Sequence, residues 1–196
     1  MRLALVQYAP AGNAPEANAA RILELYRKAA GQGAALAVFP ELALTDADAG
    51  ALLRRRDYRE RCAAAVRELA AASGGCGLVF GAPLADSEGR VYNCLLFAAG
   101  GELLHCHQQL LLPFDAAGRD RRFFSPGSEL SLVEFRGEKI GLLCGADARA
   151  IPGWPEALRY RIDPAALLAD QGATLLVNGS AFPFRTGKGA DRRAMG

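Results

Sequence analysis

AALAVFPEL, residues 34–42, is the stretch that decides the fold, because an apolar run ends there abruptly at Pro40-Glu41. A short apolar run bounded by turn signals is typical of a buried strand. Before it, residues 15–30 carry apolar side chains at the helical period, and residues 3–8 form another short apolar run. The order strand, helix, strand predicts the beginning of an α/β domain.

The helix over residues 15–30 has a sequence signal at each end. Asn13 precedes it and Glu16 follows three residues later, which is the spacing of a capping box. Gly31 and Gly33 are expected to end the helix. We therefore expect the side chain of Asn13 to cap this helix.

The rest of the chain predicts further helices and strands, and then hairpins. In order, these are a helix over 58–72, a strand over 76–80, paired strands over 90–98 and 101–108, an irregular stretch over 109–127, paired strands over 130–135 and 138–144, a helix over 164–171 and a strand over 173–178. The two hairpins are expected to turn at Gly100-Gly101 and at Arg136-Gly137. Strand–helix–strand units followed by hairpins predict an α/β fold with mixed sheets.

Length and composition favour one soluble globular domain. The chain has 196 residues, of which 51% are hydrophobic and 22% charged. Neither an apolar run of about 20 residues nor a convincing signal peptide is present, so we expect a cytoplasmic protein. The net charge of +2 is too small to indicate binding to nucleic acid or to a membrane. The sequence stops at Gly196 in what resembles the start of a helix, so we interpret 1–196 as one domain truncated at its C-terminus.

The cysteines and histidines predict neither a disulfide framework nor a metal site. Five cysteines are present, an odd number without C-x-x-C spacing, so we expect reduced thiols. His105 and His107 alternate along a predicted strand and lack an obvious third ligand, so no metal is expected.

Polar residues follow three of the predicted strands. They are Glu41, Asp147 and Ser180. Ligands of open α/β sheets bind beyond the carboxyl ends of the strands, so these residues predict a shared pocket. Each of them alone is equally compatible with a turn or a helix cap.

Several motifs, in the same order as in the family, resemble those of carbon–nitrogen hydrolases, the nitrilase superfamily. They are FPEL (39–42), GAPL (81–84), GRVYN (89–93), QLLLPFDAAGRDRRFFSPG (109–127), IGLLCGAD (140–147) and LLVNGSAFPFRTGK (175–188). Within the superfamily, the stretch 109–127 is most similar to the glutaminase domain of glutamine-dependent NAD synthetases. The resemblance implies an α-β-β-α sandwich that pairs with a second copy through its helix faces, and no cofactor.

The resemblance also implies a catalytic set that this sequence retains only in part. In the family a Cys attacks the amide carbon, a Glu takes its proton and a Lys stabilises the oxyanion. The Glu corresponds to Glu41, whereas the Lys corresponds to Gln109 and the Cys to Gly145. The acid that supports the Lys corresponds to Asp120. The substrate-pocket positions correspond to Asp115, Ser180 and Phe182, of which Asp115 and Phe182 depart from the family pattern.

Three functions remain open at this point. The leading hypothesis is a catalytically inactive glutaminase-like domain with a structural or regulatory role, whose partner would be an NAD synthetase domain. The second is an active amidase in which Cys144, one residue before the expected position, serves as a displaced nucleophile. That shift would turn its side chain to the other face of the strand unless a bulge re-aims it. The third is a non-catalytic module that binds a small molecule in the vacated pocket.

Overall fold

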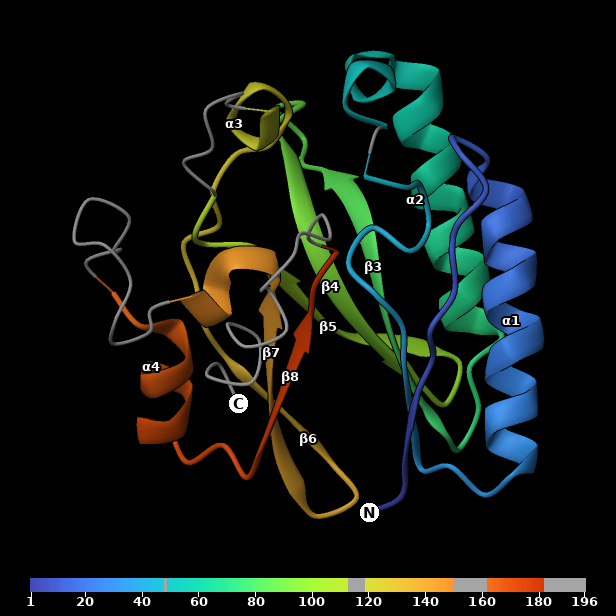
Figure 1. Ribbon diagram of the computed structural model, residues 1–196, viewed down its shortest axis with the longest axis vertical. Coiled ribbons are helices and arrows are strands. Elements are labelled where there is room, and N and C mark those ends of the chain that lie inside the picture. The colour runs from blue at the N-terminus through green and yellow to red at the C-terminus, as the bar shows by residue number, and fades with distance from the viewer. Residues whose placement is uncertain (48, 113–118, 150–161, 182–196) are drawn as a thin grey trace, which may run out of the picture.

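The computed structural model describes residues 1–47, 49–112, 119–149 and 162–181 (Figure 1). The helices and strands are β1 (Leu3–Leu5), α1 (Pro15–Gly31), β2 (Leu36–Val38), η1 (Ala49–Arg54), α2 (Arg56–Ala71), β3 (Gly77–Ala85), β4 (Val91–Ala99), β5 (Glu102–Gln108), α3 (Arg119–Phe123), β6 (Leu132–Phe135), β7 (Glu138–Cys144), η2 (Gly145–Arg149), α4 (Pro164–Asp170) and β8 (Leu175–Gly179).

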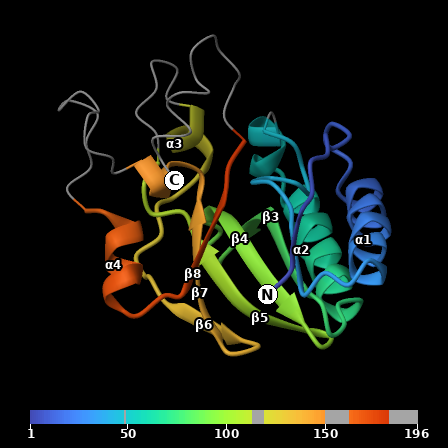
Figure 2. The ribbon, with the colours of Figure 1, turned by 60° about the horizontal axis from the view of Figure 1, so that its bottom comes forward.

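Two mixed sheets form the centre of the molecule. The first has the order β1-β2-β3-β4-β5, parallel from β1 to β3 and antiparallel from β3 to β5. The second has the order β6-β7-β8, with β6 antiparallel and β8 parallel to β7. Helices α1 and α2 cover the first sheet and α4 lies on the outer side of the second (Figures 1 and 2). The predicted α-β-β-α sandwich with mixed sheets is confirmed.

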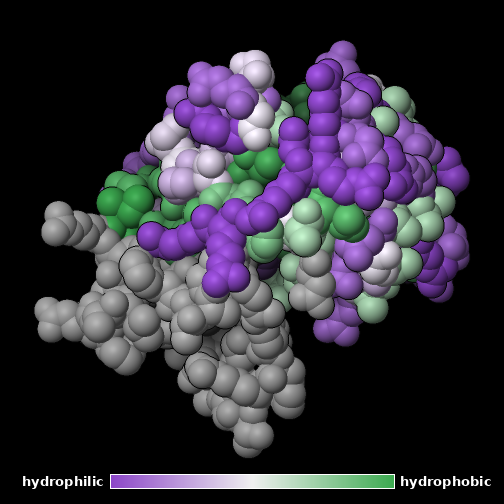
Figure 3. All heavy atoms as spheres, turned by 90° about the horizontal axis from the view of Figure 1, so that it is seen from above, coloured by the Kyte–Doolittle hydropathy of each residue, from purple (hydrophilic) through white to green (hydrophobic). Residues whose placement is uncertain are grey.

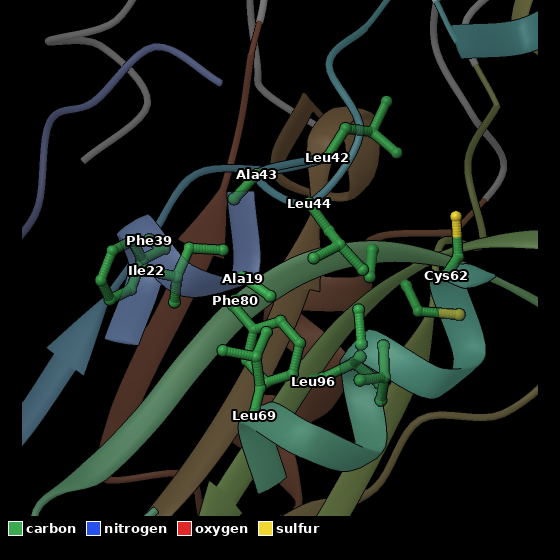
Figure 4. Packing of buried hydrophobic residues seen from close by; sticks show 14 of the residues in the cluster. Ala19, Ile22, Phe39, Leu42, Ala43, Leu44, Cys62, Leu69, Phe80 and Leu96 are labelled. Atoms are coloured by element: carbon green, nitrogen blue, oxygen red, sulfur yellow. The ribbon is translucent and has the colours of Figure 1, made fainter. Parts of the chain in front are cut away.

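Each of the two interfaces of the first sheet has its own apolar core. Between the helices and the sheet, Ile22 of α1 and Leu69 of α2 pack with Phe80 and Leu96 of the strands (Figure 4). Between the two sheets, Phe97 of β4 packs in a cluster with residues of β7 and β8. Full burial of one such side chain contributes about 1.5–3 kcal/mol, so these two layers supply most of the stabilisation.

The sequence predicted the β4–β5 and β6–β7 hairpins and both long helices, but it did not predict the β3–β4 hairpin, and the prediction at the start of α1 was wrong. Asn13 adopts a φ of 60°, and Ala14 occupies the cap position without a side-chain hydrogen bond. Asn18, one turn inside the helix, instead bonds the backbone of Ala11 and Leu44. The stretch expected to be irregular contains the short helix α3.

The exposed surface is mostly polar where the structure describes it. Figure 3 views the molecule from above and shows hydrophilic residues spread over much of the described surface. In the described ranges, none of the helices has the length and apolar character needed to cross a membrane.

The turn that follows β2 is fixed by its close approach to Gly81 on β3. The amide N of Gly81 donates to Pro40 O at 3.1 Å, and Leu44 N donates to Gly81 O at 3.1 Å. A Cβ on Gly81 would lie 2.6 Å from Glu41 Cα and closer still to Leu42 N. Only glycine therefore allows the backbone of Glu41 to lie directly on the sheet.

Substitution Gly81→Ala is expected to lower the free energy of unfolding by about 3 kcal/mol, because the added methyl group overlaps backbone that has little freedom to move. Urea unfolding followed by circular dichroism measures the change. Gly31→Ala is the control: nothing lies within 4 Å of its Cβ position, at the end of α1, so stability should be unchanged or higher. A Gly81→Ala protein as stable as the wild type would contradict the described packing.

Candidate active site

Glu41 lies just beyond β2 and uses both carboxylate oxygens. Asn93 Nδ2, on β4, donates to Oε1 at 2.7 Å. The backbone N of Ala181, just after β8, donates to Oε2 at 2.8 Å. The carboxylate thus joins the ends of strands from both sheets, and two neutral N–H groups hold its orientation.

Gln109 follows β5 directly and is 1% exposed. Its backbone N donates to Asn93 O at 2.8 Å, and its side-chain Oε1 accepts from Asn93 Nδ2 at 2.8 Å. Its Nε2 donates to Leu111 O at 3.0 Å. Asn93 therefore donates to both Glu41 and Gln109, and these bonds fix the orientation of both amides.

Gly145, at the position of the family's Cys, lies beside Glu41 and Gln109. It follows β7 as the first residue of η2 and adopts a φ of +52°, which favours glycine. A Cβ built on Gly145 would lie 2.7 Å from Glu41 Oε1 and 2.8 Å from Gln109 Nε2. Residues 41, 109 and 145 thus meet at one place, and the Glu41 and Gln109 side chains fill the volume that a side chain at 145 would need.

Asp147, which the sequence suggested as a residue of the pocket rim, is fully buried beneath it. Its Oδ1 accepts from the backbone N of Leu110 at 3.0 Å and of Leu111 at 2.8 Å. Its Oδ2 accepts from Cys144 N at 3.2 Å and lies 2.7 Å from His107 Nε2. The carboxylate therefore ties the segment after β5 to the end of β7, the two segments that carry Gln109 and Gly145.

The remaining predicted residues are described to different extents. Cys144 ends β7 and is fully buried in the core between the sheets. Ser180 follows β8 and is half-buried, next to the residue that bonds Glu41. Asp120 lies in α3, and Asp115 and Phe182 lie outside the described residues.

Sequence reasoning missed two polar residues of this region. Asn93 was quoted only as the end of GRVYN, although a buried amide at a strand end beside a carboxylate is a recognisable signal. His107 was considered only as a metal ligand, whereas it pairs with Asp147. Across the described ranges, His, Cys, Asp and Glu side chains form no group of three or more suited to a metal ion.

Asp147→Asn is expected to cost about 2–3 kcal/mol of folding free energy, because one oxygen is replaced by an NH₂ group that faces backbone donors. Urea unfolding measures the loss. The matched control is Asp57→Asn on the exposed start of α2, where the ion pair with Arg55 contributes little. Equal stability of both variants would show that Asp147 does not hold these segments.

Comparison with known proteins places these residues in a family. The chain is 28% identical to the glutamine-dependent NAD⁺ synthetase of Thermotoga maritima over 190 residues, which is 96% of this chain and 31% of that protein. It is 30% identical to that of Xylella fastidiosa over 199 residues, covering 100% of this chain and 34% of that protein. The chain thus spans about a third of the length of these curated relatives.

Solved structures share the fold. The NAD⁺ synthetase of Acinetobacter baumannii in complex with ADP superposes with a TM-score of 0.86 at 24% identity, over 97% of this chain and 34% of that one. A nitrilase-superfamily amidase from Nesterenkonia superposes with a TM-score of 0.80 at 23% identity, over 97% of this chain and 69% of that one. The carbon–nitrogen hydrolase family model matches residues 2–195, and this chain therefore belongs to the carbon–nitrogen hydrolase family, with a domain related to the glutaminase domain of NAD⁺ synthetases.

Proposed function

We propose that this chain is a carbon–nitrogen hydrolase domain that does not hydrolyse amides and has a structural or regulatory role. The observation that supports this most directly is the contact of Glu41 and Gln109 with the Cβ position of Gly145. Hydrolysis by this family's chemistry needs a nucleophile at that position, and glycine has none. The side chains of Glu41 and Gln109 occupy the space that a side chain at residue 145 would need.

The expected loss of rate is large. Removing a covalent nucleophile that acts in a coupled set costs about six orders of magnitude. Removing an oxyanion donor costs about two to three orders. Gln109 is neutral, so it brings no positive charge to the oxyanion, and one of its two amide N–H groups is already donated to Leu111 O. The two losses do not add simply, and the missing nucleophile alone is sufficient to leave negligible turnover.

The same contacts argue against a small-molecule site at this position. Asn93 bonds both Glu41 and Gln109, and each amide in the set has a protein partner. A ligand at residue 145 would have to displace this set and replace its buried hydrogen bonds, which costs affinity. The Glu41 carboxylate then serves to connect the strand ends instead of accepting a proton from a thiol.

The curated relatives indicate which kind of domain would be the partner of this one. They are glutamine-dependent NAD⁺ synthetases of which this chain spans about a third. The partner we propose is a synthetase domain that uses free ammonia. This domain would supply an assembly surface formed by α1 and α2, and the same surface would also bind a second copy of the domain.

Ammonia release from glutamine tests the proposal. The protein should release ammonia from glutamine no faster than buffer without protein, and Glu41→Gln should give the same rate. A coupled glutamate dehydrogenase assay measures it, with Glu60→Gln on the exposed face of α2 as the matched control. Release well above background that Glu41→Gln abolishes, while Glu60→Gln does not, would refute the proposal.

Acrylamide labelling tests the alternative in which Cys144 is a displaced nucleophile. In one structure of the Nesterenkonia amidase, acrylamide has added to the active-site cysteine. Here Cys144 is fully buried, so it should react no faster than Cys62, which is also fully buried. Peptide mass spectrometry gives the rate at each cysteine. Faster labelling of Cys144 than of every other cysteine would favour an active hydrolase.

A further inference from the structure

Two cysteines outside the hydrogen-bond network of Glu41 lie diagonally across the β4–β5 hairpin, and one of them, Cys94, directly follows Asn93. Cys94 lies opposite Gln108, and Cys106 lies opposite Leu96, so the two cysteines are diagonal neighbours on adjacent antiparallel strands. Both side chains project from the same face of the sheet, because Cys106 lies directly opposite Leu96, two residues from Cys94. All five cysteines are free in the structure, and no disulfide joins this pair.

The two thiols differ in access to solvent. Cys94 is fully buried in the core between the helices and the first sheet, whereas Cys106 is exposed on β5, an edge strand. Cys106 also lines a cavity of about 300 Å³ bounded by β5 and by Ser128, Glu129 and Ser131. A small oxidant in solution can therefore reach Cys106 but not Cys94.

Each thiol also changes the acidity of the other. Interaction with Cys94 lowers the pKa of Cys106, while interaction with Cys106 and burial raise the pKa of Cys94. Burial raises the pKa of Cys62 to about 12 and also raises that of Cys76. The thiolate is the reactive form of cysteine. Cys106 is both exposed to solvent and lowered in pKa, whereas Cys62, Cys76 and Cys94 are buried and raised in pKa.

We propose that Cys106 and Cys94 form a peroxide-sensitive pair, in which Cys106 is oxidised first and Cys94 then closes a disulfide. The Cys106 thiolate attacks one oxygen of hydrogen peroxide, the O–O bond breaks, and the departing hydroxide takes a proton to become water. Cys106 is left as a sulfenic acid. The Cys94 sulfur then attacks the Cys106 sulfur and loses its proton, and the hydroxyl group leaves as a second water. Two thiols and one peroxide thus give one disulfide and two waters.

The geometry predicts a strained and therefore easily reduced bond. Diagonal cross-strand neighbours lie about 7–8 Å apart, and a disulfide prefers Cα atoms at most about 6.8 Å apart. The strands must draw together by about 1 Å. This movement is feasible because β5 has no neighbour on its outer side within the described residues, and its register with β4 shifts between Phe97 and Ala98. Strained disulfides have higher reduction potentials, so a dithiol should reverse the reaction.

Peroxide treatment followed by non-reducing peptide mass spectrometry tests the pair. The wild type should yield a peptide that links Cys94 to Cys106 and disappears with dithiothreitol. In Cys94→Ala, which cannot close the disulfide, dimedone should label Cys106 at least about ten-fold faster than Cys62 or Cys76, because Cys106 is exposed and the other two are buried. Cys62→Ala is the matched control, because Cys62 is equally buried in the same layer, and this variant should still form the linked peptide.

The variants also show which results would overturn the proposal. Cys106→Ser changes an exposed residue and is expected to fold, so it should form no disulfide under peroxide. A bridge between other cysteines, a bridge only between two chains, or labelling of Cys106 no faster than of Cys62 would each overturn it. If Cys94→Ala does not fold, the linked peptide of the wild type and its absence in Cys106→Ser decide the question.

Discussion

The Asp147 carboxylate is the constraint on which the arrangement of the site depends. It lies fully buried at the end of the second sheet and accepts hydrogen bonds from the backbone after β5 and from the end of β7. A buried carboxylate is tolerable only when its oxygens are well satisfied, and His107 completes the set. Because the bonded segments carry Gln109 and Gly145, one buried group sets the relative position of both.

Above the Asp147 carboxylate, neutral amide groups hold the carboxylate of Glu41, the residue at the position of the family's general base. Asn93 lies between Glu41 and Gln109 and donates one N–H to each. Gln109 continues the chain of bonds to Leu111 O, away from the reaction centre. Asn93 and Gln109 are buried and linked by these bonds, although Asn93 Oδ1 accepts none within the described residues, and the family's Cys and Lys positions are Gly145 and Gln109. Such a network specifies a single arrangement of the strand ends, which gives Glu41 a structural role that does not depend on catalysis.

Local signals predicted the architecture well, and contacts between distant segments marked the limit of prediction. Gly100-Gly101 identified a hairpin because glycines adopt the positive φ that such turns need. Motif spacing assigned residue 145 to the same site as Glu41, and its Cβ position lies 2.7 Å from Glu41 Oε1. Motif spacing could not show that the Asp147 carboxylate would accept hydrogen bonds from backbone N–H groups. It also could not show that contacts of the loop before α1 would keep Asn13 from capping that helix. The diagonal placement of Cys106 and Cys94 across the hairpin depends on strand register, which the sequence leaves undetermined to within a residue.

The left-handed backbone at Gly145 has a consequence for any return to hydrolysis. A cysteine there would meet an unfavourable φ and would also have to push aside two side chains that are already hydrogen-bonded. A lysine at position 109, introduced alone, would place a charge where a buried amide is satisfied now. Each replacement is unfavourable when made alone, so the family's Cys and Lys would have to be introduced together, with changes in the side chains around them.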